Sequence, residues 1–239
     1  MAVVSEALNR HKLINAITRR VGVEDWALWQ PHSKLVRFEA ARPGPLSKHY
    51  ATRLIFPTTA IFSISSESPT GSLAESSLAG NEGVVGLWML ARKPHSATRF
   101  TLQTAGFGIV VSADFLNQQI GSSADFRVAI LNYASAMVRY ATQTCFCYRY
   151  HSIEEQITKT LLLTLRRTGQ PEIETTHQAL GAILGIRREA VSAAIRGLHE
   201  LGLVKQQRGR IVVLRVKELE AESCECYPAI CDMLGYSKG

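Results

Sequence analysis

The stretch from Thr175 to Leu214, TTHQALGAILGIRREAVSAAIRGLHELGLVKQQRGRIVVL, decides the fold of the C-terminal part of the chain. Two apolar runs with helical spacing are separated by Gly185, and a glycine there allows a positive φ and a sharp turn. The hydroxyl of Thr175 or Thr176 can cap the first helix. Two short β-favouring runs then flank QQRGR, which is typical of a hairpin. The stretch therefore predicts two helices, a tight turn and a wing.

The two predicted helices have inner and outer faces. Arg188, Ser192 and Arg196 recur every four positions on the outer face of the second helix, with Glu189 beside them. In a DNA major groove, Arg can read guanine and Glu can accept from cytosine. A role for Glu189 on the helix dipole is the alternative. The residues expected to face inward are Ala179, Leu180, Ile183 and Leu184 in the first helix, with Val191, Ala194, Ile195 and Leu198 in the second.

Positive charge is concentrated in the same part of the chain. Residues 176–217 carry eight Lys or Arg and two Asp or Glu, a net charge of +6, in a chain whose total is +7. Such a block fits a polyanionic partner, because Lys and Arg neutralise phosphates. A solvated basic surface without a partner is the alternative. The residues expected to contact DNA are Thr176, Gln178, Arg187, Arg188, Glu189, Ser192, Arg196, Lys205, Arg208 and Arg210.

The preceding part of the chain changes character along its length. Residues 5–20 and 23–30 have the pattern of short helices. Residues 34–112 contain short β-favouring runs separated by Pro, Gly, Asn and Ser, which suggests an antiparallel barrel or sandwich. From Ser123 to Tyr148 there is neither Gly nor Pro, which favours one long helix.

Along this long helix, aromatic and small residues recur at alternating spacings of four and three. That pattern is expected where two helices pack along their length, so it predicts a dimer interface. A helix docked on its own barrel is the alternative. The seven positions are Phe126, Ile130, Tyr133, Met137, Tyr140, Thr144 and Cys147.

Together these residues resemble the Crp/Fnr family of bacterial transcription regulators, most specifically in the winged helix-turn-helix of the opening stretch. The resemblance implies an α+β chain. Its expected parts are a cyclic-nucleotide-binding-like sensory β-roll (1–120), a dimerisation helix (121–149), a winged helix-turn-helix DNA-binding domain (150–217) and a C-terminal helical tail (218–239).

The resemblance also assigns roles to single positions. Thr176 and Gln178 match residues that contact phosphates, and Arg188 and Glu189 match base-reading residues of the family. Ser192 matches a base-contacting Ser of Fnr-type members. Ala193 departs from the family, in which many members carry an Arg at this position.

The sensory part departs further from the family. Members that bind cyclic nucleotides use a Gly-Glu pair and an Arg followed by a small residue. Here Leu87 follows Gly86, and His95 precedes Ser96 where the Arg would stand. Loss of the Arg–phosphate contact predicts that cyclic AMP does not bind. Another anion remains an alternative, with Gly86, Leu87, His95, Ser96 and Arg99 as the candidate pocket.

The chain has five cysteines, and none precedes Cys145. Cys224, Cys226 and Cys231 are three where zinc usually takes four ligands, and their C-x-C spacing is unusual for such a site. We therefore expect buried or surface thiols, no metal and no cofactor. An inter-chain bond through Cys147 is an alternative to simple core packing.

These observations predict a cytoplasmic, homodimeric, sequence-specific transcription regulator under allosteric control from the roll. Its expected partners are double-stranded DNA and a second copy, with RNA polymerase as a further candidate. No segment approaches the length of apolar sequence that a membrane span needs. No catalytic residues and no enzymatic activity are expected. A small-molecule-binding regulatory module whose helical C-terminal domain contacts proteins is the alternative.

Overall fold

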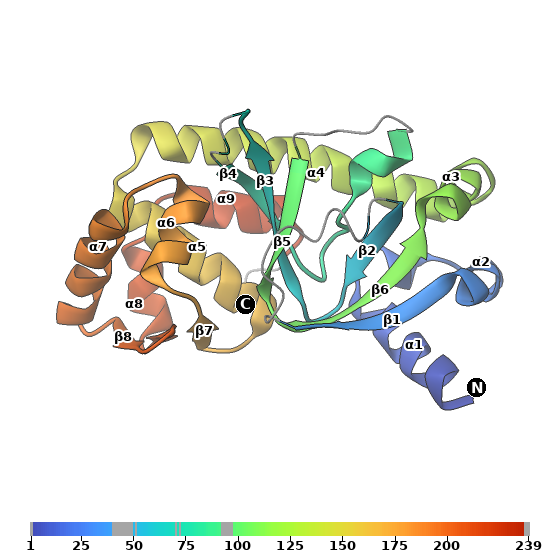
Figure 1. Cartoon of the computed structure of the whole chain (residues 1–239), viewed down its shortest axis with the longest axis horizontal. Helices are drawn as coiled ribbons and strands as arrows, with labels where there is room; N and C mark the ends of the chain where they lie inside the picture. The colour runs from blue at the N-terminus through green and yellow to red at the C-terminus, as the bar shows by residue number, and fades with distance from the viewer. Residues whose placement is uncertain are drawn as a thin grey trace. The chain divides into compact units, whose positions relative to one another are not determined.

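A computed structural model describes residues 2–39, 50, 52–69, 71, 73–91 and 98–236 (Figure 1). The chain forms two compact units. The first contains residues 1–65 and 78–137, and the second contains residues 66–77 and 138–239. Among the described residues, no helix is both long and apolar enough to cross a membrane.

The N-terminal helix is shorter than the sequence predicts. Helix α1 covers Ala2–Ile14 and is followed by the single turn η1 at Thr18–Arg20. The side chain of Asn15 accepts hydrogen bonds from the backbone N–H groups of Ile17 and Thr18, which replaces the helical pattern at this point. The expected helix over 5–20 is therefore wrong in its second half. Helix α2 (Val23–Trp29) and the turn η2 (Gln30–His32) follow.

The β-rich region forms two three-stranded sheets, in agreement with the predicted barrel or sandwich of short strands. One sheet has the order β1-β6-β2, with antiparallel pairing on both sides of β6, and the other has the order β4-β3-β5. The strands are β1 (Ser33–Phe38), β2 (Arg53–Pro57), β3 (Ile61–Glu67), β4 (Leu73–Ala79), β5 (Thr98–Thr104) and β6 (Gly106–Ser112), with the short helical turn η4 (Leu87–Ala91) between β4 and β5.

Aromatic rings fill the interior of the first unit. Trp29 and Phe126 are both fully buried, and their ring centroids lie 4.7 Å apart in an edge-to-face arrangement. Phe62 and Phe100 are likewise buried in a second cluster between the strands. This core fixes the first part of the long helix against the roll.

The long helix exists as predicted. Helix α3 (Ala113–Ser122) leads into α4 (Ala124–Tyr150), which has 27 residues and forms one continuous helix in Figure 1. Tyr133 of α4 packs against Gly83, and a Cβ at position 83 would lie 2.1 Å from ring atom Cε2 of Tyr133. Gly83 is therefore required for this close approach.

The predicted dimer seam is placed differently. Six of its seven residues are buried within the chain itself, and Met137 is half-buried. Phe126, Ile130 and Tyr133 belong to the core of the first unit, and Cys147 is buried in the second unit with Cys224. The burial of these residues agrees with the alternative interpretation, in which the helix docks on its own chain. The expectation that they form a dimer interface is corrected, because their side chains are already covered.

After the last part of α4, the second unit continues with helices and a small sheet. Helix α5 begins with a capping box, in which Ser152 accepts from the N–H of Glu155 and the Glu155 side chain accepts from the N–H of Ser152. The elements are α5 (Ile153–Thr168), β7 (Glu172–Glu174), α6 (His177–Leu184), α7 (Arg188–Glu200), β8 (Val204–Gln207), β9 (Arg210–Val213), α8 (Val216–Ala221) and α9 (Cys226–Met233).

The wing has one strand more than the sequence predicts. Strands β8 and β9 form the expected hairpin, and β7 pairs with the other edge of β9. In β7 the buried Ile173 lies opposite Ile211, which gives this short segment its place in the sheet. The sequence does not indicate this strand, because three residues are too few to show the alternation by which a strand is recognised.

Candidate nucleic-acid interface

The turn between α6 and α7 has the predicted geometry. Gly185 ends α6 with φ of 68°, in the left-handed region, and its N–H donates to the carbonyl of Gly181. The N–H of Ile186 donates to the same carbonyl at 2.9 Å. A Cβ at position 181 would lie 2.8 Å from the carbonyl oxygen of Ile186, so Gly181 permits this close approach. The two helices are thus held in a tight corner.

Helix α7 presents the two faces that the sequence predicts. Its inner residues Val191, Ala194, Ile195 and Leu198 are buried. Arg187, Arg188, Glu189 and Arg196 are exposed. The guanidinium groups and the carboxylate therefore lie on the side of the helix that is open to a partner.

Two positions differ from their expected environment. Ser192 is half-buried, and its hydroxyl donates to the carbonyl of Arg188 at 3.0 Å. The same oxygen lies 2.8 Å from Nδ1 of His177, so Ser192 connects α7 to α6 within the domain. Ala179 is exposed, because it occupies the first turn of α6 next to the cap, where that helix has no neighbour to cover it. The buried residues of α6 are Leu180, Gly181 and Leu184.

The N-terminal end of α6 lies beside the wing. Thr176 is the N-cap, and its hydroxyl accepts from the N–H of Ala179 at 3.0 Å. Thr176, Gln178 and Arg188 line one side of an open groove of about 340 Å³, and the wing residues Arg208 and Arg210 line the other. The groove brings together polar groups from three separate elements.

The wing cations are not equivalent. Lys205 and Arg208 are exposed, and Gly209 takes a positive φ of 76° at the tip of the hairpin. Arg210 forms an ion pair with Glu172 of β7. Part of the charge of Arg210 is thus neutralised within the domain, whereas Lys205 and Arg208 form no ion pair with any residue that the structure describes.

The electrostatics of the groove are positive, which affects the one histidine at its edge. Burial, and after it the charge of Arg188, lowers the pKa of His177 below its usual 6.5. His177 is therefore neutral near pH 7. It contributes a hydrogen bond to Ser192 and no net charge to the groove.

The helices and wing that form the groove also match a known domain. Residues 156–222 match the family model of the Crp-like helix-turn-helix domain. A search of curated protein sequences gave no match. Among solved structures, a transcriptional regulator assigned to the Crp/Fnr family from Eubacterium rectale aligns with a TM-score of 0.66 and 16% identity over 85% of this chain and 95% of its own. FixK2 from Bradyrhizobium japonicum aligns with a TM-score of 0.64 and 15% identity over 80% of this chain and 98% of its own.

Residues 156–222 are thus a Crp-like helix-turn-helix domain, and the chain shares its fold with these Crp/Fnr structures. The fold shared with these structures is the one predicted, with a β-roll region, a long helix and a C-terminal helix-turn-helix. The family match covers α6, α7 and the wing, which are the elements that carry the groove.

The region in which the sequence predicts a ligand pocket is described only in part. Gly86 has a positive φ of 90°, and Leu87 begins η4 and packs against the core that contains Trp29. An apolar side chain that packs against the core thus stands where the family resemblance would place a carboxylate. Arg99 lies in β5. His95 and Ser96 lie outside the described residues.

Sequence reasoning missed one group of side chains in this chain. Cys224 and Cys226 do not stand with Cys231, but with Cys147 and His151 at the end of α4. The four-residue spacing of Cys147 and His151 near a helix end was the available signal, because it places both side chains on one face. The C-terminal cysteines alone offer too few ligands, so their spacing did not predict a group of four.

Proposed function

We propose that the protein is a homodimeric, sequence-specific DNA-binding transcription regulator. The observation that carries the proposal is the exposed edge of α7, where Arg188, Glu189 and Arg196 project while the aliphatic back of the helix is buried. An Arg and a carboxylate at the start of a helix suit the donor and acceptor pattern of the major groove. Arg208 and Lys205 on the wing would contact the phosphate backbone beside it.

A second face of α4 supports the dimer. Val128, Leu131 and Val138 are apolar side chains with exposed fractions of 53%, 62% and 68%. With Ser135, Thr142 and Cys145 they continue the alternating three- and four-residue spacing along the helix. We name this set the outer stripe. Exposed apolar residues at coiled-coil spacing are expected where two helices pack along their length. The outer stripe thus replaces the buried seam as the proposed interface.

Control by the first unit is the finer part of the proposal. Leu87 offers no hydrogen-bond acceptor where cyclic-nucleotide members place a Glu, so this roll would not hold a cyclic nucleotide in their manner. A signal of another kind would act by favouring one of two positions of α4, provided that its affinity differs between them.

The DNA interaction is tested by binding to duplexes from the region upstream of the protein's own coding sequence, at several salt concentrations. We expect affinity to fall linearly with salt on a logarithmic scale, because phosphate contacts release counterions. Arg188→Ala should weaken binding to the preferred duplex by about 1–3 kcal/mol, since a base contact is lost, while binding to unrelated duplexes changes much less.

Lys217→Ala is the matched control, because Lys217 is an exposed cation on α8 that does not line the groove. It removes the same charge without removing a base contact. Equal losses in the two variants, on preferred and unrelated duplexes alike, would show that α7 contributes charge only. Absence of DNA binding together with tight binding to a protein would favour the regulatory module with protein contacts.

A further inference from the structure

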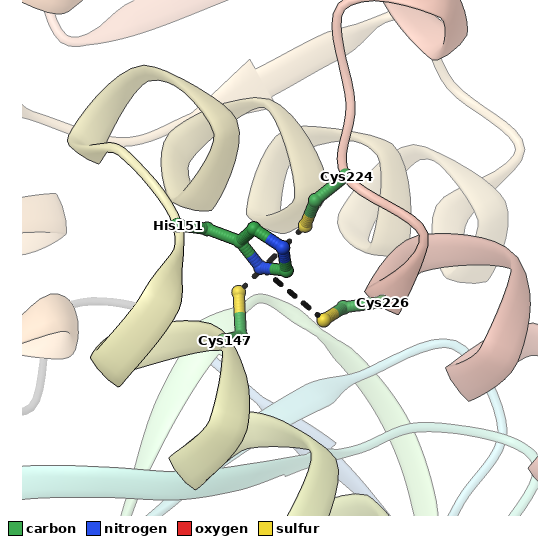
Figure 2. A group of neighbouring side chains, drawn as sticks. All are labelled: Cys147, His151, Cys224 and Cys226. Carbon is green, nitrogen blue, oxygen red and sulfur yellow. Dashed lines mark hydrogen bonds between the residues drawn. The ribbon is translucent and has the colours of Figure 1, made fainter.

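Four side chains with metal-binding atoms converge in the second unit. Cys147 lies in the last turn of α4 and His151 directly follows that helix, whereas Cys224 comes from the segment between α8 and α9 and Cys226 is the first residue of α9. Figure 2 shows the four side chains pointing toward one another. Their ligand atoms all lie within 4.8 Å of one another. The three cysteines are buried and His151 is half-buried, so the positions of these side chains are fixed by packing inside the unit.

The separations match a single tetrahedral ion. Sγ of Cys147 lies 3.8 Å from Sγ of Cys224, and Sγ of Cys226 lies 3.5 Å from Nδ1 of His151. With Zn–S bonds of about 2.3 Å and Zn–N bonds of about 2.0 Å, tetrahedral angles separate two sulfurs by about 3.8 Å and a sulfur and nitrogen by about 3.5 Å. We propose that Cys147, His151, Cys224 and Cys226 bind one Zn²⁺ ion. This proposal goes beyond DNA binding and does not depend on it.

Neighbouring groups are placed to orient these ligands. Nε2 of His151 lies 3.2 Å from a carboxylate oxygen of Glu225. A neutral imidazole would donate its Nε2–H to Glu225 and direct the lone pair of Nδ1 to the ion, an arrangement that recurs around zinc-bound histidines. The side-chain amide of Gln143 donates to Sγ of Cys226 at 3.1 Å, which favours the thiolate that a metal requires.

Charge compensation is also present. Three thiolates, a neutral imidazole and Zn²⁺ carry a net charge of −1, and the three thiol protons are released to solvent on binding. Lys159 of α5 is almost completely buried and interacts electrostatically with Cys147. A buried lysine beside the sulfurs would thus balance the charge of the site.

Two other fates of these cysteines fit less well. A disulfide between Cys147 and Cys224 would involve only two of the four side chains. It would not explain why Cys226 and His151 lie beside them. An iron–sulfur cluster with more than one iron distributes its ligands over several metal atoms, and these ligands stand too close together for that. One ion would connect the end of α4 to the start of α9, which are separated in the sequence by the whole winged helix-turn-helix.

The test measures metal in the full-length chain, produced with zinc in the growth medium and purified without chelator. We expect one zinc per chain by elemental analysis. Replacement with Co²⁺ should give the intense visible absorption of a tetrahedral thiolate site. Cys226→Ser should lose most of the bound metal and this absorption, whereas Cys145→Ser, which removes an exposed cysteine of the same helix, should keep both.

Stability provides a readout for the unaltered chain. Chelation of the metal should lower the melting temperature by roughly 5 °C or more, and added Zn²⁺ should restore it, because a ligand that binds only the folded state stabilises that state. Glu225→Gln, at an exposed position, should raise the dissociation constant for Zn²⁺ by about 10-fold or more.

Four results would overturn the assignment. They are the absence of zinc and of the Co²⁺ spectrum in the wild-type chain, equal metal loss in Cys145→Ser and Cys226→Ser, an iron–sulfur absorption spectrum, and a Cys147–Cys224 disulfide in the freshly purified chain. Three of these results are read on the wild-type chain alone, so poor folding of Cys226→Ser would not decide the matter.

Discussion

Helices α4 and α7 are both amphipathic, but their sequences reveal their partners to different degrees. On α7 the inner residues are aliphatic and the outer edge is charged, so the pattern by itself separates core from surface. On α4 both the buried face and the outer stripe repeat at spacings of three and four, and both contain apolar residues. Periodicity therefore identifies the faces of a helix. It identifies the buried one only where the other face is polar.

The largest effect is expected from the buried face of α4. Phe126→Ala should lower the free energy of unfolding by about 3–5 kcal/mol, because a fully buried ring in edge-to-face contact with Trp29 is replaced by a cavity. Urea denaturation measures this change. Val128→Ala on the outer stripe is the control and should change the stability of the monomer by less than about 0.5 kcal/mol. A reversed order would mean that the two faces are exchanged in solution.

The next effect concerns the outer stripe. Leu131→Asp should weaken self-association by about 100-fold or more, roughly 3 kcal/mol, because a charge would enter an apolar helix interface. Sedimentation equilibrium measures the dissociation constant. Asn132→Asp adds the same charge at an adjacent exposed position outside the outer stripe and should leave the dimer intact. If the two variants dissociate equally, or if the wild-type chain is monomeric, the outer stripe is not the interface.

A smaller effect distinguishes the two wing arginines that face α7 across the groove. Arg208→Ala should reduce the slope of log affinity against log salt by about 1, as expected when one phosphate contact is lost. Arg210→Ala should reduce it less, because Arg210 already forms an ion pair with Glu172. Fluorescence anisotropy with a labelled duplex measures both slopes. Equal slopes for the two variants would contradict the proposed division of roles.

The smallest effect is the pH dependence at the contact between α6 and α7. The pKa of His177 is lowered in the folded state, so below about pH 6.5 the unfolded chain binds a proton that the folded chain does not. The contribution of this group to stability is complete above about pH 6.5 and is lost as pH falls below it. Urea denaturation at about pH 7 and about pH 5.5 should therefore show a smaller fall for His177→Gln than for the wild type. An identical fall would exclude this role.

Much of the DNA-binding domain could be predicted because its signals are local. Gly185, the Thr176 cap and the aliphatic stripe of α7 each act within a few residues of their position in the sequence. The length of α4 was predictable for the same reason, since it needs only the absence of Gly and Pro.

Features that depend on distant residues were not predictable in this way. The break of α1 at Asn15 is stabilised by bonds from its side chain to Pro57 and Gly83 as well as by its local turn. Strand β7 exists because β9 offers an edge to Ile173. The group of Cys147 and Cys224 forms only when α4 and the C-terminal segment are folded together. In each case the decisive partner lies tens of residues away.

The contact of Gly83 with Tyr133 has a mechanical consequence. The ring of Tyr133 contacts the backbone of the loop that follows β4 directly, because residue 83 has no side chain between them. A displacement of that loop would push α4 immediately, and a larger residue at this position would do so permanently. Gly83→Ala would therefore imitate a moved loop, and it would show in one substitution whether the roll can drive the long helix.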